Sequence, residues 1–193
     1  EVEKPNEIVI GKTNREPKSY EKIRNMLEDD GVAISYLDGR LYIYGGEKRG
    51  TLYAVYQFLE YFLHVRWYAS DCEKYPDELD ANISRRTNII RRPVIAVRDS
   101  FWYDYIKDSG FAVKHKINSG FGRKIPEHMG GSVDYVGGRN CHTLAELLPE
   151  SEYFAEHPEY YALVKGERKP TQPCLSNPKV LEIVIKNAKK WIK

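Results

Sequence analysis

The pattern of hydrophobic and polar positions divides the first part of the chain into short strands and helices. Apolar runs that end at Gly or at Asp-Gly predict strands, and apolar residues spaced three and four apart predict helices. The predicted order is strand, helix, strand, strand, helix, strand, over residues 7–11, 17–27, 32–36, 41–44, 51–63 and 64–68. Asp38-Gly39 is the strongest hairpin signal of the chain. This order is typical of an α+β layer, and we expect it to bury its helices on one face of a sheet.

The second predicted helix follows a pair of glycines, Gly45 and Gly46, that ends the preceding strand. Thr51 or Gly50 is available as its N-cap. One helical face carries apolar residues at the expected spacing, namely Leu52, Val55, Tyr56, Leu59 and Leu63. We expect this face to be the buried one.

Residues 70–92 change character, because Asp, Glu, Pro, Asn, Ser and Arg dominate them. Most of this stretch reads as a linker, although Ile89-Ile90 can pair as an edge strand. Arginines flank that strand at positions 85, 86, 91 and 92. Charges at such positions guard a sheet edge against pairing with another chain.

After Pro93 the pattern favours alternating strands and helices. Val94–Val97 is a continuous apolar run, which is typical of a strand buried on both faces of a parallel sheet. The further predictions are a helix over 110–118, a glycine-rich loop over 119–139, a helical turn or strand at 144–148, a helix at 150–156, strands at 160–164 and 172–175, and a final helix that begins at Asn177-Pro178.

These elements read as βα units of a parallel sheet. A closed (β/α)8 TIM barrel needs eight such units, and only two or three fit between Pro93 and Lys193. The predicted fold class is therefore α/β, with a small N-terminal α+β sandwich domain over 1–80, a linker or edge strand over 81–92, and an incomplete TIM barrel over 93–193. The remainder of the barrel would lie outside the chain. The alternative is a self-contained small α/β domain, dimeric across its uncovered face.

Composition narrows the class of protein. With 41% hydrophobic and 30% charged residues and no long apolar run, the chain is typical of soluble proteins without a membrane span. A net charge of +2 argues against a nucleic-acid groove. The three cysteines lack zinc-site spacing, and at least one of them is unpaired within the chain. No cofactor is expected.

Two stretches resemble known proteins. Residues 45–69, GGEKRGTLYAVYQFLEYFLHVRWYA, look like the small domain that precedes the catalytic barrel in several bacterial glycoside hydrolases. The later motifs HTL at 142–144, LLP at 147–149, HPEYYAL at 157–163 and QPCLSNP at 172–178 resemble a bacterial family, domain of unknown function 4838. This family is similar in layout to α-glucuronidases and β-hexosaminidases, with a small α+β domain before a (β/α)8 barrel.

The resemblance implies an exported protein, secreted, periplasmic or on the cell surface, that acts on complex polysaccharides. Its expected partner is an oligo- or polysaccharide. The resemblance provides no established catalytic residues, because in the related hydrolases the acidic pair lies on later barrel strands. Those strands would lie beyond Lys193, and the chain itself offers no convincing carboxyl pair at the spacing that glycoside hydrolysis needs.

Candidate contacts follow the first predicted barrel strand, where barrel sites lie. Arg98 can bind a sugar carboxylate or vicinal hydroxyls through two parallel donors, or it can form a structural ion pair with a neighbouring loop. Asp99 lies beside it. The ring of Trp102 can stack on a pyranose face, or pack in the core.

His142 and Asn177 are the other candidates. His142 follows the glycine-rich loop and can bond a sugar hydroxyl or cap the loop. Asn177 ends a predicted strand, where it can contact substrate, although a helix N-cap is its more common role. The histidines show no HExxH or similar spacing, so no metal site is expected. The sequence leaves three hypotheses, a hydrolase, a non-catalytic carbohydrate-binding module and an interaction scaffold.

Overall fold

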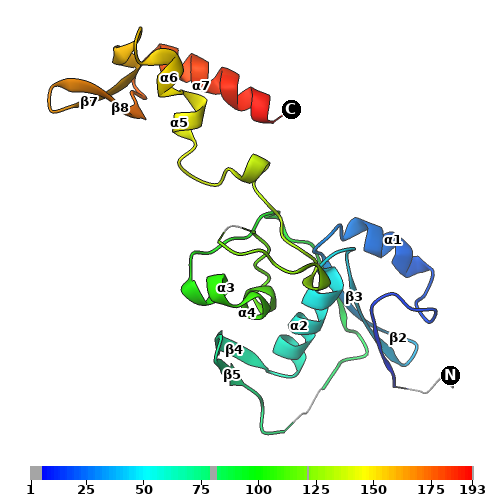
Figure 1. The fold of residues 1–193 in the computed structure, drawn as a ribbon. Coiled ribbons are helices and arrows are strands. Elements are labelled where there is room, and N and C mark those ends of the chain that lie inside the picture. Colours follow the sequence, from blue (N-terminus) through cyan, green and yellow to red (C-terminus); the bar gives the residue numbers. More distant parts are fainter. Residues whose placement is uncertain (1–5, 79–81, 121, 193) are drawn as a thin grey trace. The chain divides into compact units, whose positions relative to one another are not determined.

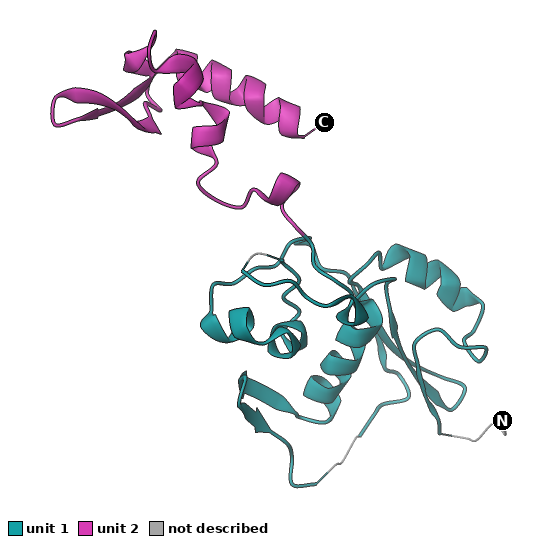
Figure 2. Cartoon of the chain, in the orientation of Figure 1, with its two compact units in different colours: residues 1–133 teal, residues 134–193 magenta. Residues whose placement is uncertain are grey.

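The computed structural model describes residues 6–78, 82–120 and 122–192, which form a mixed α/β structure. The chain divides into two compact units, residues 1–133 and 134–193 (Figure 2). The first unit contains β1 (Ile8–Ile10), α1 (Ser19–Met26), β2 (Val32–Leu37), β3 (Arg40–Gly45), α2 (Gly50–Phe62), β4 (Arg66–Ala69), β5 (Cys72–Lys74), β6 (Asn88–Arg91), α3 (Tyr103–Lys107), α4 (Ser109–Lys114) and a 3-10 turn, η1 (Glu127–Met129). The second unit contains η2 (Val136–Gly138), α5 (Leu144–Leu147), α6 (Glu150–Tyr153), η3 (Pro158–Tyr160), β7 (Tyr161–Val164), β8 (Glu167–Pro173) and α7 (Pro178–Trp191).

A four-stranded sheet with the order β1-β3-β2-β6 forms the framework of the first unit. The β2–β3 hairpin turns at Asp38-Gly39 and β1 joins β3 in parallel, so the predicted strands and the predicted hairpin are confirmed. The Ile89-Ile90 segment is the edge strand β6, antiparallel to β2. β2 therefore lies inside the sheet, which explains why four successive residues, 32–35, are buried.

Helices cover both faces of this sheet, so the expectation of a single covered face was wrong (Figure 1). On β3, Leu41 and Ile43 pack with α2, whereas Tyr42 and Tyr44 pack with α1. Tyr20 of α1 stacks on Tyr44 with ring centroids 4.7 Å apart. The alternation of strand side chains explains the two layers, because both alternating sets of β3 are apolar or aromatic.

The most buried face of α2 also differs from the predicted one. The residues that contact the sheet are Tyr53, Ala54 and Phe58, which lie on the side of the helix roughly opposite to the predicted set. The predicted residues are partly buried; several of them border the sheet cluster, and Tyr56, Leu59 and Leu63 also pack against Val65, Trp67 and Phe111. Because α2 is apolar on most sides and lies between two clusters, spacing alone does not identify the face that meets the sheet.

The predicted strand over Val94–Val97 is absent. This segment consists of bends, and Val94 is completely exposed to solvent. A strand of this kind needs neighbouring strands to accept its backbone hydrogen bonds, and the described residues provide none for it. The helix expected over 110–118 exists as α4, which buries Phe111, Ala112 and Val113.

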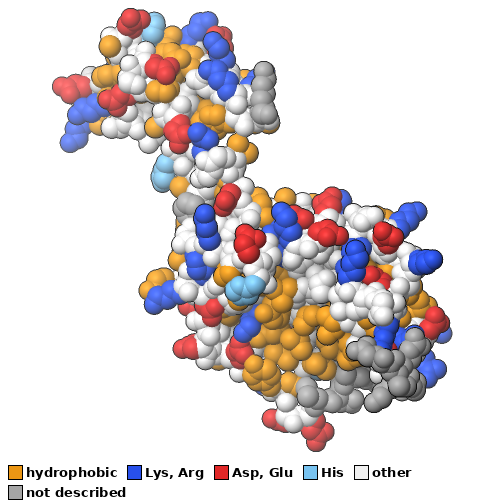
Figure 3. All heavy atoms as spheres, turned by 45° about the vertical axis from the view of Figure 1, so that its right-hand side comes forward, with side chains coloured by type: hydrophobic (Ala, Val, Ile, Leu, Met, Phe, Trp, Pro, Cys, Tyr) orange, Lys and Arg blue, Asp and Glu red, His pale blue; other side chains and the backbone are white. Residues whose placement is uncertain are grey.

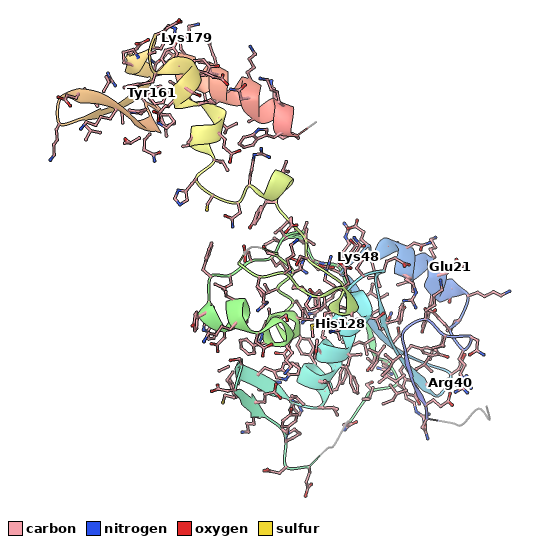
Figure 4. The ribbon with its side chains drawn as sticks, in the orientation of Figure 1. Glu21, Arg40, Lys48, His128, Tyr161 and Lys179 are labelled. Atoms are coloured by element: carbon pink, nitrogen blue, oxygen red, sulfur yellow. The ribbon has the colours of Figure 1, made fainter. Side chains whose placement is uncertain are left out.

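The second unit is a β-hairpin with helices. β7 and β8 are antiparallel and turn at Lys165-Gly166. Its core consists of Leu148, Tyr161 and Val180, and Figure 4 labels Tyr161. The final helix begins as predicted, because the Asn177 side chain accepts a hydrogen bond from the Lys179 amide at 3.0 Å.

The mixed α/β class is thus confirmed. The described residues form no closed barrel. The boundaries proposed at residues 80 and 93 stay a prediction.

Two buried tyrosines of the first unit, Tyr44 and Tyr53, predict a loss of stability at alkaline pH. Burial raises the pKa of Tyr44 and of Tyr53 to about 12. Unfolded tyrosine loses its proton near pH 10, so between about pH 10 and 12 only the unfolded state is deprotonated, and stability falls as pH rises. We expect each tyrosine to contribute up to about 2–3 kcal/mol to this loss. Urea unfolding across this range measures it, and the double variant Tyr44→Phe, Tyr53→Phe should show a shallower decline. An equal decline would contradict the assignment.

Candidate functional site

A buried cluster of charged side chains lies in the first unit, and Asp30 is at its centre. Asp30 is in the loop that connects α1 with β2. Its Oδ1 accepts a hydrogen bond from Arg49 Nε at 2.6 Å, and its Oδ2 accepts one from Asn118 Nδ2 at 2.8 Å. Arg98 donates through Nη2 to the same Oδ2. Both carboxylate oxygens are therefore occupied by donors.

Arg98 uses its donors within the first unit. Its Nε donates to the carbonyl of Lys116 at 2.7 Å, and its Nη1 donates to the carbonyl of Ile95 at 2.8 Å. Its backbone amide donates to Asn118 Oδ1 at 2.7 Å. The structure thus contains the ion pair that was one of the two alternatives for Arg98, and sugar binding by this residue stays a prediction.

Arg49 extends the cluster to the glycine-rich loop. It immediately precedes α2, and only 1% of the residue is exposed. Its Nη1 donates to the carbonyls of Gly130 and Gly131 at 2.8 and 3.0 Å. Asp30, Arg49 and Arg98 together join segments that lie far apart in the sequence. Two guanidinium groups thus face the buried Asp30 carboxylate, and the half-exposed Asp29 carboxylate lies 3.9 Å from Arg49 Nη2.

A hollow of about 450 Å³ adjoins the cluster. Asp30, Arg49 and Arg98 line one part of it, and Glu28, Asp29 and Arg92 line another. Arg92 Nη1 donates to Glu28 Oε1 at 2.6 Å, in an exposed pair. A ligand in this hollow meets donors and acceptors side by side, an arrangement that suits hydroxyl groups, which both donate and accept.

The ring of Tyr53 packs against Arg98. The guanidinium carbon of Arg98 lies 5.8 Å from the centroid of this ring. Burial is the main cause of the raised pKa of Tyr53, and the nearby Asp30 carboxylate raises it further, whereas the two arginines lower it. The phenol is therefore neutral at physiological pH.

Exposed aromatic residues follow the cluster. Phe101, Trp102 and Tyr103 are all more than half exposed, and Trp102 is 51% exposed. The Trp102 ring meets the rings of Tyr105 and Phe111 edge to face, with centroids 5.2 and 6.2 Å apart. Trp102 therefore packs against neighbouring rings and also exposes half of its surface to solvent.

Asp99 differs from Arg98 in its contacts. Its Oδ1 accepts a hydrogen bond from the Ser100 amide at 2.8 Å. Its Oδ2 is buried without a hydrogen-bond partner among the described residues. A buried acceptor of this kind is available to a donor from a ligand or from water.

The remaining two predicted residues belong to the second unit. His142 is exposed, has a left-handed backbone with φ of 54°, and lines a groove of about 750 Å³. Asn177 caps α7, which was the more common of its two roles. Arg98, Asp99 and Trp102 lie in the first unit and are near one another because they are close in sequence. His142 and Asn177 lie in the second unit. Their roles in substrate binding stay predictions.

The sequence analysis missed Asp30, Arg49 and Asn118. Asp30 resembles an ordinary loop residue before Gly31, and Arg49 lies just before a predicted helix, where a charged residue is common. Asn118 lies 88 residues from Asp30, so no local pattern connects them. A lone Asp between two short elements carries no signal of burial, because the partners that compensate its charge come from elsewhere in the fold.

The described residues also bear on metal binding, cysteine pairing and membrane insertion. Across residues 6–78, 82–120 and 122–192, no group of three His, Cys, Asp or Glu side chains is arranged to hold a metal ion. Cys72, Cys141 and Cys174 are free thiols. None of the helices in these ranges has the length and apolar character to cross a membrane.

Comparison with known families identifies a match over residues 67–193, which is well over half of the chain. The matching family is described as "Domain of unknown function (DUF4838)". The match begins at Trp67, so most of the stretch that resembles the leading domain of glycoside hydrolases lies before it. No curated protein and no solved structure matches the chain. The chain belongs to the DUF4838 family.

Proposed function

We propose that the chain is the leading part of an exported bacterial protein of glycoside-hydrolase type that acts on complex polysaccharide. The observation that carries this proposal is the Trp102 ring, which packs edge to face with Tyr105 and Phe111 and is 51% exposed. A half-exposed indole held by neighbouring rings is suited to stack on the apolar face of a pyranose. The hollow beside the Asp30 cluster offers donors and acceptors for sugar hydroxyls.

The barrel is part of the same proposal. Val94 and Ile95 are exposed, as are Leu181 and Ile185 on α7 and Ile192 directly after it. Exposed apolar residues of this kind indicate that further chain covers them in each unit. We infer that additional βα units of a barrel supply this cover. Figure 3 shows how hydrophobic side chains gather on one face of the first unit, bordered by charged groups.

Export and the catalytic acids rest on the resemblance. Asp30 has both oxygens occupied, and Glu28 is paired with Arg92. Neither is arranged as the acid or the nucleophile of a glycosidase, so the acidic pair is expected on later strands.

The 193-residue chain is therefore expected to be catalytically silent. Incubating it with a panel of aryl glycosides and measuring the release of the chromophore checks this prediction. The full-length protein, assayed in parallel, should turn over at least one substrate. Clear turnover by the 193-residue chain would refute the placement of the acids.

Binding provides the second test. Trp102→Ala is expected to weaken the affinity of the full-length protein for its polysaccharide by about five- to tenfold, because the stacking surface is lost. Tyr68→Ala, which removes another exposed aromatic residue of the first unit, is the control and should change little. Affinity electrophoresis in gels that contain the polysaccharide measures both. Equal effects of the two variants would count against stacking at Trp102.

A non-catalytic carbohydrate-binding protein is the second candidate. It is favoured by the occupied oxygens of Asp30, which leave this cluster a binding surface without acid–base chemistry. Binding on a glycan array without turnover by the full-length protein would select this function.

A further inference from the structure

The second unit contains a groove that is built by an irregularity of its hairpin. Tyr161 of β7 pairs with Pro173 of β8, but the next residue, Ala162, pairs with Lys169. One step along β7 therefore corresponds to four steps along β8. Pro170, Thr171 and Gln172 are left outside the ladder and line the groove. Bulges of this kind redirect side chains, and they are frequent beside functional sites.

The walls of the groove are held in place. Tyr161 is 2% exposed, and its hydroxyl donates to the carbonyls of Leu148 and Pro149 at 3.2 and 3.0 Å. Asn187 of α7 donates to the carbonyl of Leu147 at 2.9 Å. The two prolines at the ends of the bulge, Pro170 and Pro173, restrict its backbone. The hydrogen-bonding groups of the groove are therefore positioned before any ligand arrives.

His142 also lines this groove. Its backbone has a left-handed φ of 54°, a conformation in which His, like Asn and Asp, is more frequent than most residues. The residue is exposed, so its imidazole is accessible to a ligand.

The chemistry of the lining indicates the class of ligand. The polar side chains are those of His142, Thr143, Glu150, Ser151, Thr171 and Gln172. Among the lining residues, which all lie in the described part of the chain, none is Lys or Arg. An anionic ligand would thus find a carboxylate and no fixed cation, whereas hydroxyl groups find both donors and acceptors. The groove also has leucine and proline in its lining, which suit C–H faces, and its volume of about 750 Å³ is within the usual range for ligand sites.

We propose that this groove, whose lining includes His142 and Gln172, binds a neutral saccharide segment. The proposal rests on the carbohydrate function proposed above and adds a binding surface and a charge class to it. It does not depend on Trp102, because that residue lies in the first unit.

The test is an NMR titration of the 193-residue chain with cellohexaose, xylohexaose and maltohexaose, and with trigalacturonate as an anionic comparison. We expect saturable binding of at least one neutral hexasaccharide, with shifts of the Gln172 side-chain amide, and no comparable binding of trigalacturonate. His142→Gly, whose backbone accepts a left-handed φ, and Gln172→Ala should each raise the Kd about five- to tenfold. His157→Ala, which removes an exposed histidine of the same unit that does not line the groove, should leave the Kd unchanged.

The proposal is overturned if no neutral hexasaccharide binds, if both groove variants bind as well as the original chain, or if trigalacturonate binds more tightly. A result in which the groove variants have no effect while Trp102→Ala still weakens polysaccharide binding by the full-length protein would reject the groove and retain the proposed function. Retained folding of each variant is checked from its amide spectrum in the same titration.

Discussion

Replacing Asp30 by Ala is expected to destabilise the first unit by about 3–5 kcal/mol. The substitution leaves Arg49 and Arg98 without their shared carboxylate, and the Arg49 side chain is almost completely buried. An uncompensated buried cation is costly because neither water nor another acceptor replaces the lost partner. It also frees the Asn118 amide group, which donates to Asp30.

Asp29→Ala is the matched control for this variant. Asp29 is the preceding residue, its side chain is 47% exposed, and it lies 3.5 Å from the exposed Lys48 and 3.9 Å from Arg49 Nη2. Surface pairs of this kind contribute little, so we expect a change below about 1 kcal/mol. Figure 4 labels Lys48 beside the start of α2.

Urea unfolding followed by tryptophan fluorescence measures both variants. Trp191→Phe in all samples restricts the signal to the first unit, which contains Trp67 and Trp102. Hydrogen exchange at Asn118 and Ser119 gives a local readout, because both amides donate to the carbonyl of Arg98 at 3.1 Å. Their exchange should accelerate in Asp30→Ala. Similar losses of stability in the two variants would show that Asp30 is not the centre of the cluster.

Gly46→Ala is expected to destabilise the first unit by about 3 kcal/mol or more. A Cβ atom at this position would lie 1.9 Å from the carbonyl oxygen of Glu28, so the backbone must move. The same close approach recurs nearby, where a Cβ on Gly45 would lie 2.0 Å from the carbonyl carbon of Gly50. The glycines therefore allow the end of β3 to lie directly against the loop that carries Asp30.

Gly39→Ala is the control that separates the steric effect expected at Gly46 from the cost of an unfavourable backbone conformation. Gly39 has a φ of 80°, and a Cβ there would meet no atom within 4 Å. Its substitution forces an L-residue into a left-handed conformation, which costs about 1–2 kcal/mol. The same urea assay compares the two variants. A loss in Gly46→Ala no larger than that in Gly39→Ala would contradict the steric explanation.

Much of the first unit followed from local pattern. The order of its first six elements, the Asp38-Gly39 hairpin and the edge strand at Ile89-Ile90 were all predicted and confirmed. These features depend on turn chemistry and on short periodic segments, which neighbouring residues determine. The cap of α7 at Asn177 is of the same kind, since its donor, the Lys179 amide, is two residues away.

Prediction failed where a long-range partner decides the outcome. The run Val94–Val97 has the composition of a buried strand, yet it forms none, because a strand exists only when another strand pairs with it. The prediction of the sheet-facing side of α2 was wrong for a similar reason. α2 packs against two apolar clusters, and helical spacing alone does not show which of them contains the sheet.

The candidate-site residues show the same division between features set by local sequence and features set by long-range contacts. The sequence by itself determined the elements, their turns and caps, the membership of the family and the candidate residues Arg98, Asp99, Trp102, His142 and Asn177. Only the tertiary structure decided that Arg98 shares Asp30 with Arg49, and that a bulge in β8 opens a groove beside His142. Local pattern reflects interactions between residues a few positions apart, whereas burial of a charge or the shape of a groove depends on partners brought together by folding.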